Sequence, residues 1–122
     1  MILKSLRPAF VSMLAGILVA AVPLAASAES LAGKVGDRRY PAQFGQTKGP
    51  CQQAYKQYVA ASGHSAYAQT HINYDAEAFF CGSFYNAPTQ KAAEERALAD
   101  CNSVFTKYKV KTAGRCTVYA SK

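Results

Sequence analysis

The sequence predicts a small, disulfide-stapled α+β domain with the order helix, strand, strand, helix, strand. Three observations lead to this prediction: an N-terminal export signal, four cysteines downstream of it, and stretches of helical and strand periodicity after residue 50. An even set of cysteines in an exported chain is typical of a disulfide framework. We expect a three-stranded, mainly antiparallel sheet with both helices on one face.

Residues 1–28 have the composition of a signal peptide. Two basic residues precede an apolar stretch at residues 11–22, and small residues lead to a cleavage position after Ala28. An uncleaved membrane anchor is the alternative, but the apolar stretch is short and Pro23 interrupts it. We therefore expect an exported, soluble product without a stable membrane span, in the periplasm or in the external medium.

The remaining chain of 94 residues is one domain at most, and burial of apolar surface leaves a domain of that size little stability to spare. Two disulfides, each worth about 3 kcal/mol, would therefore matter. The net charge of +5 favours anionic partners such as a phosphorylated glycolipid, an acidic glycan or a membrane surface, whereas nucleic acid is not expected. Solubility alone is the alternative reason for this charge.

Residues 29–49 are predicted to be a flexible N-terminal arm, ahead of a single stapled domain at residues 50–122. The arm is rich in glycine, contains a charge cluster and shows no apolar periodicity. From Pro50 the pattern changes, because apolar and small residues recur at helical spacing as far as Ser62. Gly63 is expected to end this first helix.

Two strand patterns follow the first helix. Residues 64–70 alternate in side-chain type, and a polar loop leads into a second alternating stretch at residues 77–85. The two stretches are expected to pair as an antiparallel hairpin. In this arrangement Ala66, Ala68 and Cys81 face the helices.

The strongest helical pattern lies at residues 89–109. Cys101 belongs to its apolar stripe, acidic residues lie in its early turns and lysines lie at its end, as the helix dipole favours. After a turn, residues 115–120 alternate again and predict the last strand. We expect Cys116 and Ala120 on the inner face of this strand.

The four cysteines allow three pairings. Because the apolar stripe of a helix and the inner face of a strand should meet in one core, the pattern favours Cys101 with Cys116 and Cys51 with Cys81. The main competitor joins Cys51 to Cys101 and Cys81 to Cys116. A zinc site is disfavoured, because the cysteines lie 30, 20 and 15 residues apart without short-spaced ligand pairs.

Residues 92–120 contain A-A-E-E-R-A-L-A-D-C-N and then C-T-V-Y-A. This combination resembles a group of small exported bacterial proteins known mainly as a domain of unknown function. In that group a hairpin precedes an alanine-rich helix ending in Cys, and a short strand beginning with Cys closes the domain. The resemblance implies a Cys101–Cys116 disulfide, but it does not point to any activity. The first helix with Cys51 departs from the pattern.

Catalytic motifs are missing from the sequence. The nucleophile elbow, the phosphate-binding glycine loop and paired metal-ligand histidines do not occur. His64 and His71 are expected on the surface, and nothing fixes either beside a nucleophile. We therefore expect no enzymatic activity, no metal and no cofactor, although a dispersed triad is recognised only by its geometry.

One candidate binding surface is aromatic. If both helices cover one face of the sheet, the other face displays Tyr67, Phe80, Phe84 and Tyr119. Such a face suits a partner, a ligand or a dimer contact. The alternative is that the arm or the first helix covers it.

The other candidate surface is basic. Its residues gather at the end of the second helix and in the following loop: Lys107, Lys109, Lys111 and Arg115. They are suited to phosphate or sulfate groups, although the helix dipole alone attracts lysines to this position.

The sequence thus favours a non-enzymatic secreted or periplasmic recognition module for an envelope, host or other anionic or protein partner. An inhibitor or immunity-type protein that blocks another protein's active site with the loop at residues 71–76 is the alternative. A small hydrolase is the second alternative. The oligomeric state is open, with a dimer through the sheet face as one arrangement.

Overall fold

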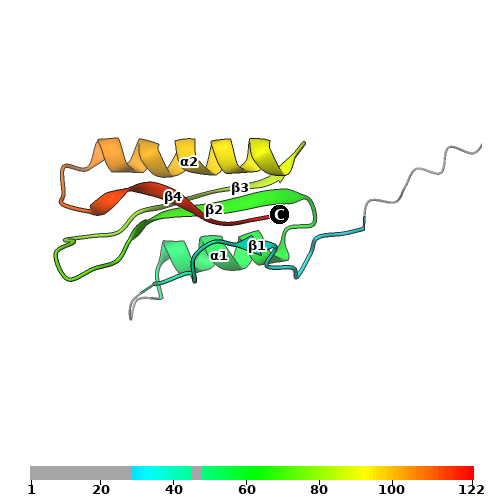
Figure 1. Ribbon diagram of the computed structural model, residues 1–122, viewed down its shortest axis with the longest axis horizontal. Helices are drawn as coiled ribbons and strands as arrows, with labels where there is room; N and C mark the ends of the chain where they lie inside the picture. The colour runs from blue at the N-terminus through cyan, green and yellow to red at the C-terminus, as the bar shows by residue number, and fades with distance from the viewer. Residues whose placement is uncertain (1–28, 45–47) are drawn as a thin grey trace, which may run out of the picture.

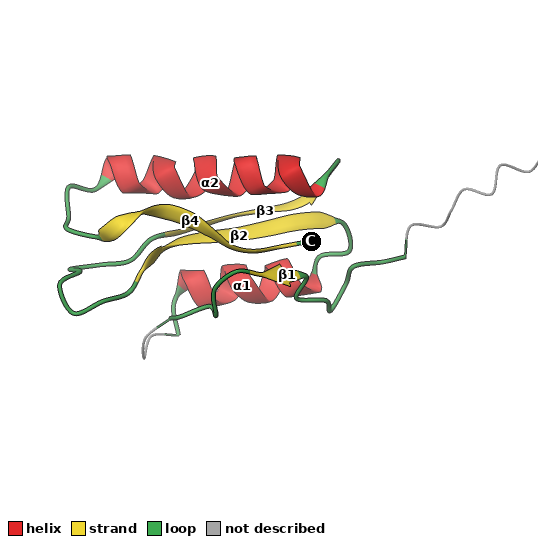
Figure 2. Cartoon of the chain, in the orientation of Figure 1, coloured by secondary structure: helices red, strands yellow, loops and turns green. Residues whose placement is uncertain are grey.

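The computed structural model describes residues 29–44 and 48–122, and the expected signal peptide lies outside the described residues. The elements are, in chain order, β1 (Asp37–Arg38), α1 (Pro50–Ala60), β2 (His64–His71), β3 (Cys81–Ala87), α2 (Gln90–Lys107) and β4 (Ala113–Ser121). Figure 2 shows helices and strands along the chain. The strands form one antiparallel sheet in the order β1-β4-β2-β3. The sequence therefore predicted the mixed α and β class and the two helices, but one strand too few.

The helices α1 and α2 lie on opposite faces of the sheet (Figure 1). Our expectation of both helices on one face is wrong. The reason lies in β2, where residues 65–70 are all buried, so that both faces of this strand need a cover. The fold is a three-layer arrangement with the sheet in the middle, and the dimer expected through a bare sheet face loses its basis.

The additional strand, β1, comes from the segment expected to be a flexible arm. Asp37 pairs with Ser121 and Arg38 with Ala120. The backbone N–H groups of Arg39 and Tyr40 both donate to the carbonyl of Tyr119, at 2.8 and 3.3 Å. Part of the arm thus lies along β4, because the edge of that strand offers hydrogen-bonding groups to any extended neighbour.

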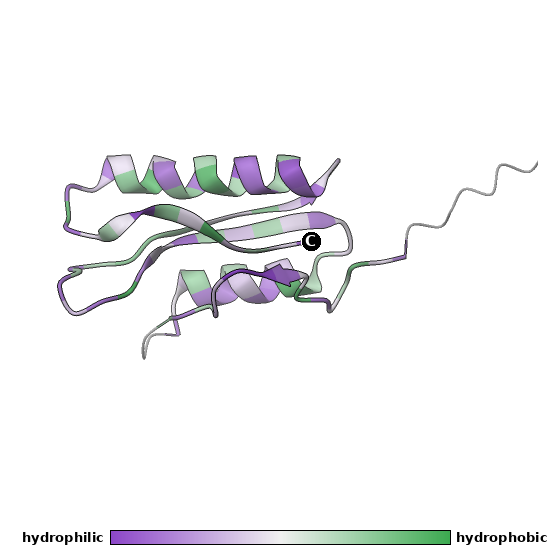
Figure 3. Ribbon diagram, viewed as in Figure 1, coloured by the Kyte–Doolittle hydropathy of each residue, from purple (hydrophilic) through white to green (hydrophobic). Residues whose placement is uncertain are grey.

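Small residues build the core on the α2 side of the sheet. Ala66 and Ala68 of β2 pack against Ala93 and Ala97 of α2, and all four are fully buried. Figure 3 shows hydrophobic and hydrophilic positions alternating along α2, as expected for a helix that covers a sheet with one side. The Thr89 side chain caps α2 by accepting a hydrogen bond from the Ala92 N–H at 3.0 Å.

Tyrosines build the core on the α1 side. Tyr58 of α1, Tyr67 of β2 and Tyr119 of β4 have at most 1% of their surface exposed. Tyr55 and Phe44 pack against Tyr67, with ring centroids 5.3 and 6.3 Å away. The face expected to be an exposed aromatic surface is thus covered by α1 and by part of the arm, the alternative that the sequence left open.

Strand register explains which residues share a face. Ala66 pairs with Phe84 and Gln69 with Cys81, so Phe84 faces α2 and Cys81 faces α1. This corrects the expected common face of Cys81 and Ala66. A register shift between β2 and β4 also places Ala120 in the α1-side core rather than on the face of Cys116.

Candidate functional site

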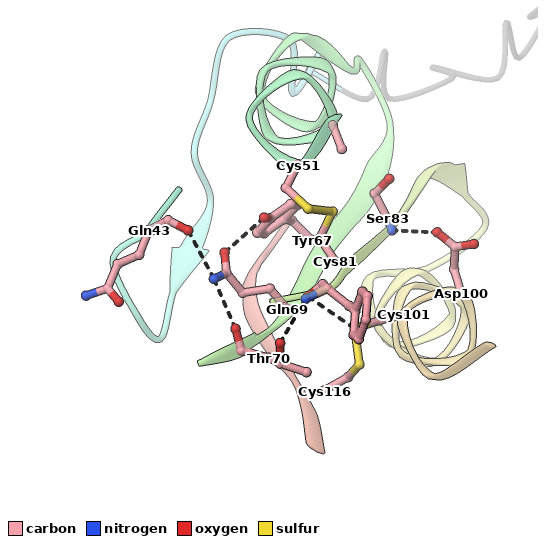
Figure 4. Close-up of a disulfide and its surroundings, with 12 residues drawn as sticks. Gln43, Cys51, Tyr67, Gln69, Thr70, Cys81, Ser83, Asp100, Cys101 and Cys116 are labelled. Carbon is pink, nitrogen blue, oxygen red and sulfur yellow. Dashed lines mark hydrogen bonds between the residues drawn. A yellow bond between two sulfur atoms is a disulfide. The ribbon is translucent and has the colours of Figure 1, made fainter. Parts of the chain in front are cut away.

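Two disulfides staple one helix each to the sheet (Figure 4). Cys51 is joined to Cys81 on the α1 side, with Cα atoms 5.7 Å apart. Cys101 is joined to Cys116 on the α2 side, with Cα atoms 6.0 Å apart. Both pairings predicted from the sequence are confirmed, and the competing pairing is wrong. No free cysteine occurs in residues 29–44 and 48–122, and the two disulfides indicate an oxidising, exported environment.

An apolar hollow lies where the start of α1, the start of β3 and the end of α2 meet. It has a volume of about 590 Å³. Its lining is formed by Phe44, Gly49, Pro50, Cys51, Gln52, Phe79, Phe80, Cys81, Val104 and Tyr108. The Cys51–Cys81 disulfide is therefore part of its wall. We refer to this hollow as the apolar pocket.

Phe80 and Tyr108 form one wall of the apolar pocket. Their rings stack with centroids 5.8 Å apart and planes inclined by 18°. Thr70 fixes the backbone of Phe80, because its N–H donates to the Phe80 carbonyl and its Oγ1 accepts from the Phe80 N–H, both at 2.9 Å. Tyr108 is 52% exposed, so this wall reaches from the pocket to the molecular surface.

Phe44, another residue of the lining, is placed next to a buried polar network on the α1 side. The Tyr67 hydroxyl donates to Oε1 of Gln69 at 2.9 Å, and Nε2 of Gln69 donates to the carbonyls of Gln43 and Thr70, both at 3.1 Å (Figure 4). Burial raises the pKa of Tyr67. Because Gln43 is held in this way, the next residue, Phe44, is positioned against the pocket.

A basic segment borders the pocket. In residues 107–111, here called the lysine segment, lysine alternates with Tyr108 and Val110, and every residue is exposed. Nζ of Lys107 lies 5.9 Å from the ring centroid of Tyr108. Within the described part of the chain, none of the three lysines forms an ion pair. One acidic residue, Glu77, meets the segment, where its Oε2 accepts from the Lys111 N–H at 3.3 Å.

The structure separates the other predicted binding residues from this place. Tyr67 is buried against Tyr55 of α1, and Tyr119 is buried on the same side of the sheet against Tyr40 of the arm. Phe84 lies beneath the Arg96 guanidinium, whose carbon is 4.7 Å from the ring centroid. Arg115 lines a different hollow, of about 340 Å³, together with residues of α2. Of the predicted residues, only Phe80 and the three lysines come together.

Sequence reasoning did not foresee that Lys122 is buried. This residue is 5% exposed, and four backbone carbonyls lie within hydrogen-bond distance of Nζ and share its N–H groups. The acceptors are Leu31 at 2.7 Å, Lys34 at 3.2 Å, Val59 at 3.0 Å and Ala61 at 2.6 Å. Burial lowers the pKa of Lys122, while the carbonyls favour its charged form. The ammonium thus joins part of the arm to the end of α1.

The histidines do not form a catalytic arrangement with the pocket. Nδ1 of His71 lies 2.6 Å from the Tyr119 hydroxyl, and Nδ1 of His64 lies 3.3 Å from the Lys122 carbonyl. The pocket lining holds neither a histidine nor a carboxylate nor a free thiol. Among the residues that the structure describes, no three His, Cys, Asp or Glu side chains are grouped to hold a metal ion. The lining thus offers mainly apolar surface.

Comparison of the chain with family models, curated proteins and solved structures found no match. The resemblance of residues 92–120 to small exported bacterial proteins therefore stays a prediction. No helix in the described ranges has the length and apolar character needed to cross a bilayer.

Proposed function

We propose that the protein is an exported, non-enzymatic recognition module that binds an anionic partner at the apolar pocket and the lysine segment. The observation that supports this proposal is the position of three lysines, without ion pairs in the described residues, beside a pocket of about 590 Å³. Pockets of about 300–1,000 Å³ are typical of small-molecule sites. The module acts in the periplasm or the external medium.

The two parts of this site contribute differently to binding. A lysine and an anionic group 4 Å apart in water attract each other by about 1 kcal/mol, and salt screens this attraction. Burial of apolar surface contributes about 25 cal/mol per Å². The lysines therefore attract and orient any anionic partner, and the pocket adds affinity for a partner that also carries an apolar group.

A pair of charge-matched variants tests the location of the site. Replacing Lys107, Lys109 and Lys111 by Gln should weaken binding to immobilised sulfated glycan or to anionic phospholipid vesicles by about tenfold or more. Replacing Lys34, Lys56 and Lys91 by Gln removes the same charge elsewhere and should change binding less than about twofold. Equal losses in both variants would show that net charge, and not this site, attracts the ligand.

An inhibitor is the second candidate function, and one observation favours it. Tyr74 is fully exposed in the loop between β2 and β3. Oδ1 of Asn73 shapes this loop by accepting hydrogen bonds from the N–H groups of Asp75 and Ala76, at 3.0 and 2.9 Å. A projecting aromatic residue on a shaped loop is typical of an interface anchor. Under this alternative, Tyr74→Ser abolishes capture of one stoichiometric protein partner while the lysine variant captures it normally.

A further inference from the structure

We infer that the apolar pocket takes the acyl chain of an anionic amphiphile, with the charged headgroup held at the lysine segment. This inference rests on the proposed function and specifies the chemical class of its ligand. The same chemistry occurs in a free fatty acid and in a membrane phospholipid, and the experiment below separates these two sources.

The lining decides what enters the pocket. Apart from Gln52 and Tyr108, every side chain in the wall is apolar or belongs to the Cys51–Cys81 disulfide. A polar group without a hydrogen-bond partner in such a place costs about 1–3 kcal/mol, and a charge costs more. The part of the ligand inside the pocket is therefore a hydrocarbon. Phe44, Phe80 and Val104 come from distant parts of the chain, so the wall is irregular, and a flexible acyl chain can follow it.

The position of the charges decides how the ligand is oriented. Tyr108 belongs both to the pocket wall and to the lysine segment, and Nζ of Lys107 lies 5.9 Å from its ring centroid. An acyl chain that passes Tyr108 brings its headgroup to the exposed lysines on either side. A carboxylate or phosphate at that end is attracted, whereas a quaternary ammonium is repelled. Glu77 lies at Lys111, so Lys107 and Lys109, which flank Tyr108 in the chain, are expected to dominate.

The disulfide in the wall provides a readout that does not depend on affinity alone. Dithiothreitol reduces a disulfide by thiolate attack on one sulfur, which forms a mixed disulfide and releases one cysteine. Its second thiol then closes a ring and releases the other cysteine. An acyl chain in the pocket covers Cys51–Cys81 and should slow this reaction. Cys101–Cys116, on the opposite face of the sheet with Cys101 fully buried, is the internal control.

The experiment compares decanoate, acetate and decyltrimethylammonium as probes, using calorimetric titration and the rate of Cys51–Cys81 reduction. Decanoate should bind and should slow reduction of Cys51–Cys81 about tenfold relative to reduction of Cys101–Cys116. Decyltrimethylammonium should bind at least about tenfold more weakly than decanoate, and acetate should change neither measurement. Phosphatidylglycerol vesicles form a parallel arm. Stronger binding to vesicles than to decanoate identifies a membrane lipid as the source, and the reverse identifies a free amphiphile.

Two neighbouring residues of α2 give matched variants. Val104→Trp fills the apolar pocket and should abolish decanoate binding, whereas Phe105→Trp alters the other hollow and should not. Circular dichroism checks that both variants fold. Decanoate binding that survives Val104→Trp, or no decanoate binding to the unaltered protein, overturns the inference. If the lysine variant alone then loses binding to sulfated glycan, the proposed function stands although the acyl-chain inference has failed.

Discussion

The two faces of the sheet are built on different principles. On the α2 side, alanines and Gly82 let the helix backbone come close, and α2 lies nearer to the sheet than α1 does. On the α1 side, large tyrosines and a buried glutamine fill the space and are joined by hydrogen bonds. The first face depends on shape and tolerates little change in volume. The second depends on polar partners, and it carries Phe44 and Cys51 of the apolar pocket.

The two faces of the sheet thus contribute differently, so stability and binding depend on different parts of one small domain. Tight packing of small residues leaves no room for a ligand, whereas a layer of long side chains leaves space at its edge. The pocket lies at that edge, where the start of α1 meets the end of α2. Changes on the α2 face should therefore reduce stability first, and changes near α1 should also alter binding.

Removal of a disulfide should have the largest effect. Replacing Cys101 and Cys116 by Ala should lower the free energy of unfolding by about 3–5 kcal/mol, because a loop of this size contributes about 3 kcal/mol and a packed side chain is lost as well. Urea unfolding measures this loss. Replacing Cys51 and Cys81 by Ala should cost a similar amount but also remove decanoate binding. Equal decanoate binding by both double variants would contradict the claim that binding depends on the α1 side of the sheet.

A methyl group at Gly82 should be the most damaging single change on the α2 face. A Cβ atom there would come within 2.5 Å of the Ala97 carbonyl oxygen and closer still to the Cys101 nitrogen. Because both are backbone atoms, α2 has to move away, and Gly82→Ala should cost about 3 kcal/mol. Ser83→Ala on the same strand should cost no more than about 1 kcal/mol. A Gly82→Ala variant with unchanged thermal stability contradicts the close packing of this face.

Loss of the buried ammonium should weaken the α1 side. Lys122→Met removes the donor for four carbonyls and should cost about 2 kcal/mol. Hydrogen exchange should show the loss of protection mainly at the end of α1 and near Leu31. Lys91→Met, at an exposed position, is the control. A change in exchange confined to α2 would contradict the role assigned to Lys122.

High pH should also lower the stability of the α1 side. The loss should be small where the tyrosines of the unfolded chain begin to ionise. Burial raises the pKa values of Tyr58, Tyr67, Tyr85 and Tyr119, so these hydroxyls stay protonated in the folded protein while they ionise in the unfolded chain. Stability should therefore fall as pH rises above about 10, by up to about 1.4 kcal/mol per pH unit for each of Tyr58 and Tyr67, whose pKa values burial raises most. The lowered pKa of Lys122 opposes this trend with a single group. Urea unfolding between pH 9 and 11, about the ordinary tyrosine range, checks the sign, and stability that rises there contradicts it.

The sequence predicted those features that depend on local patterns. Helical spacing located α1 and α2, and alternation located β2 and β4, whereas β3 begins four residues after the predicted start at residue 77. The predicted positions of the cysteines on helices and strands identified both disulfides. β1 was missed because two polar residues carry no periodicity. The placement of the helices on one face was wrong because it required the register of β3 and β4 against β2, which a loop and bulges determine.

The candidate site was predicted only in part, for a related reason. The lysines and Phe80 stood out because charge and aromatic content are visible in the sequence. The pocket joins Phe44, Phe80 and Val104, which are distant in sequence and become neighbours only when helices cover both faces. The burial of Lys122 was not foreseen because lysine is rarely buried, and the neighbouring residues in the sequence do not indicate the carbonyls that surround it.

The most direct test of the account is a nuclear magnetic resonance titration of the protein with decanoate. The side-chain signals of Phe80, Val104 and Tyr108 should shift together with a single dissociation constant, and the Val104 methyl groups should show contacts to the middle of the acyl chain. The signals of Tyr74 and Phe105 should stay unchanged. Shifts centred on Tyr74 or on the Phe105 hollow, or none at Val104, would contradict the claim that the apolar pocket and the lysine segment form one binding site.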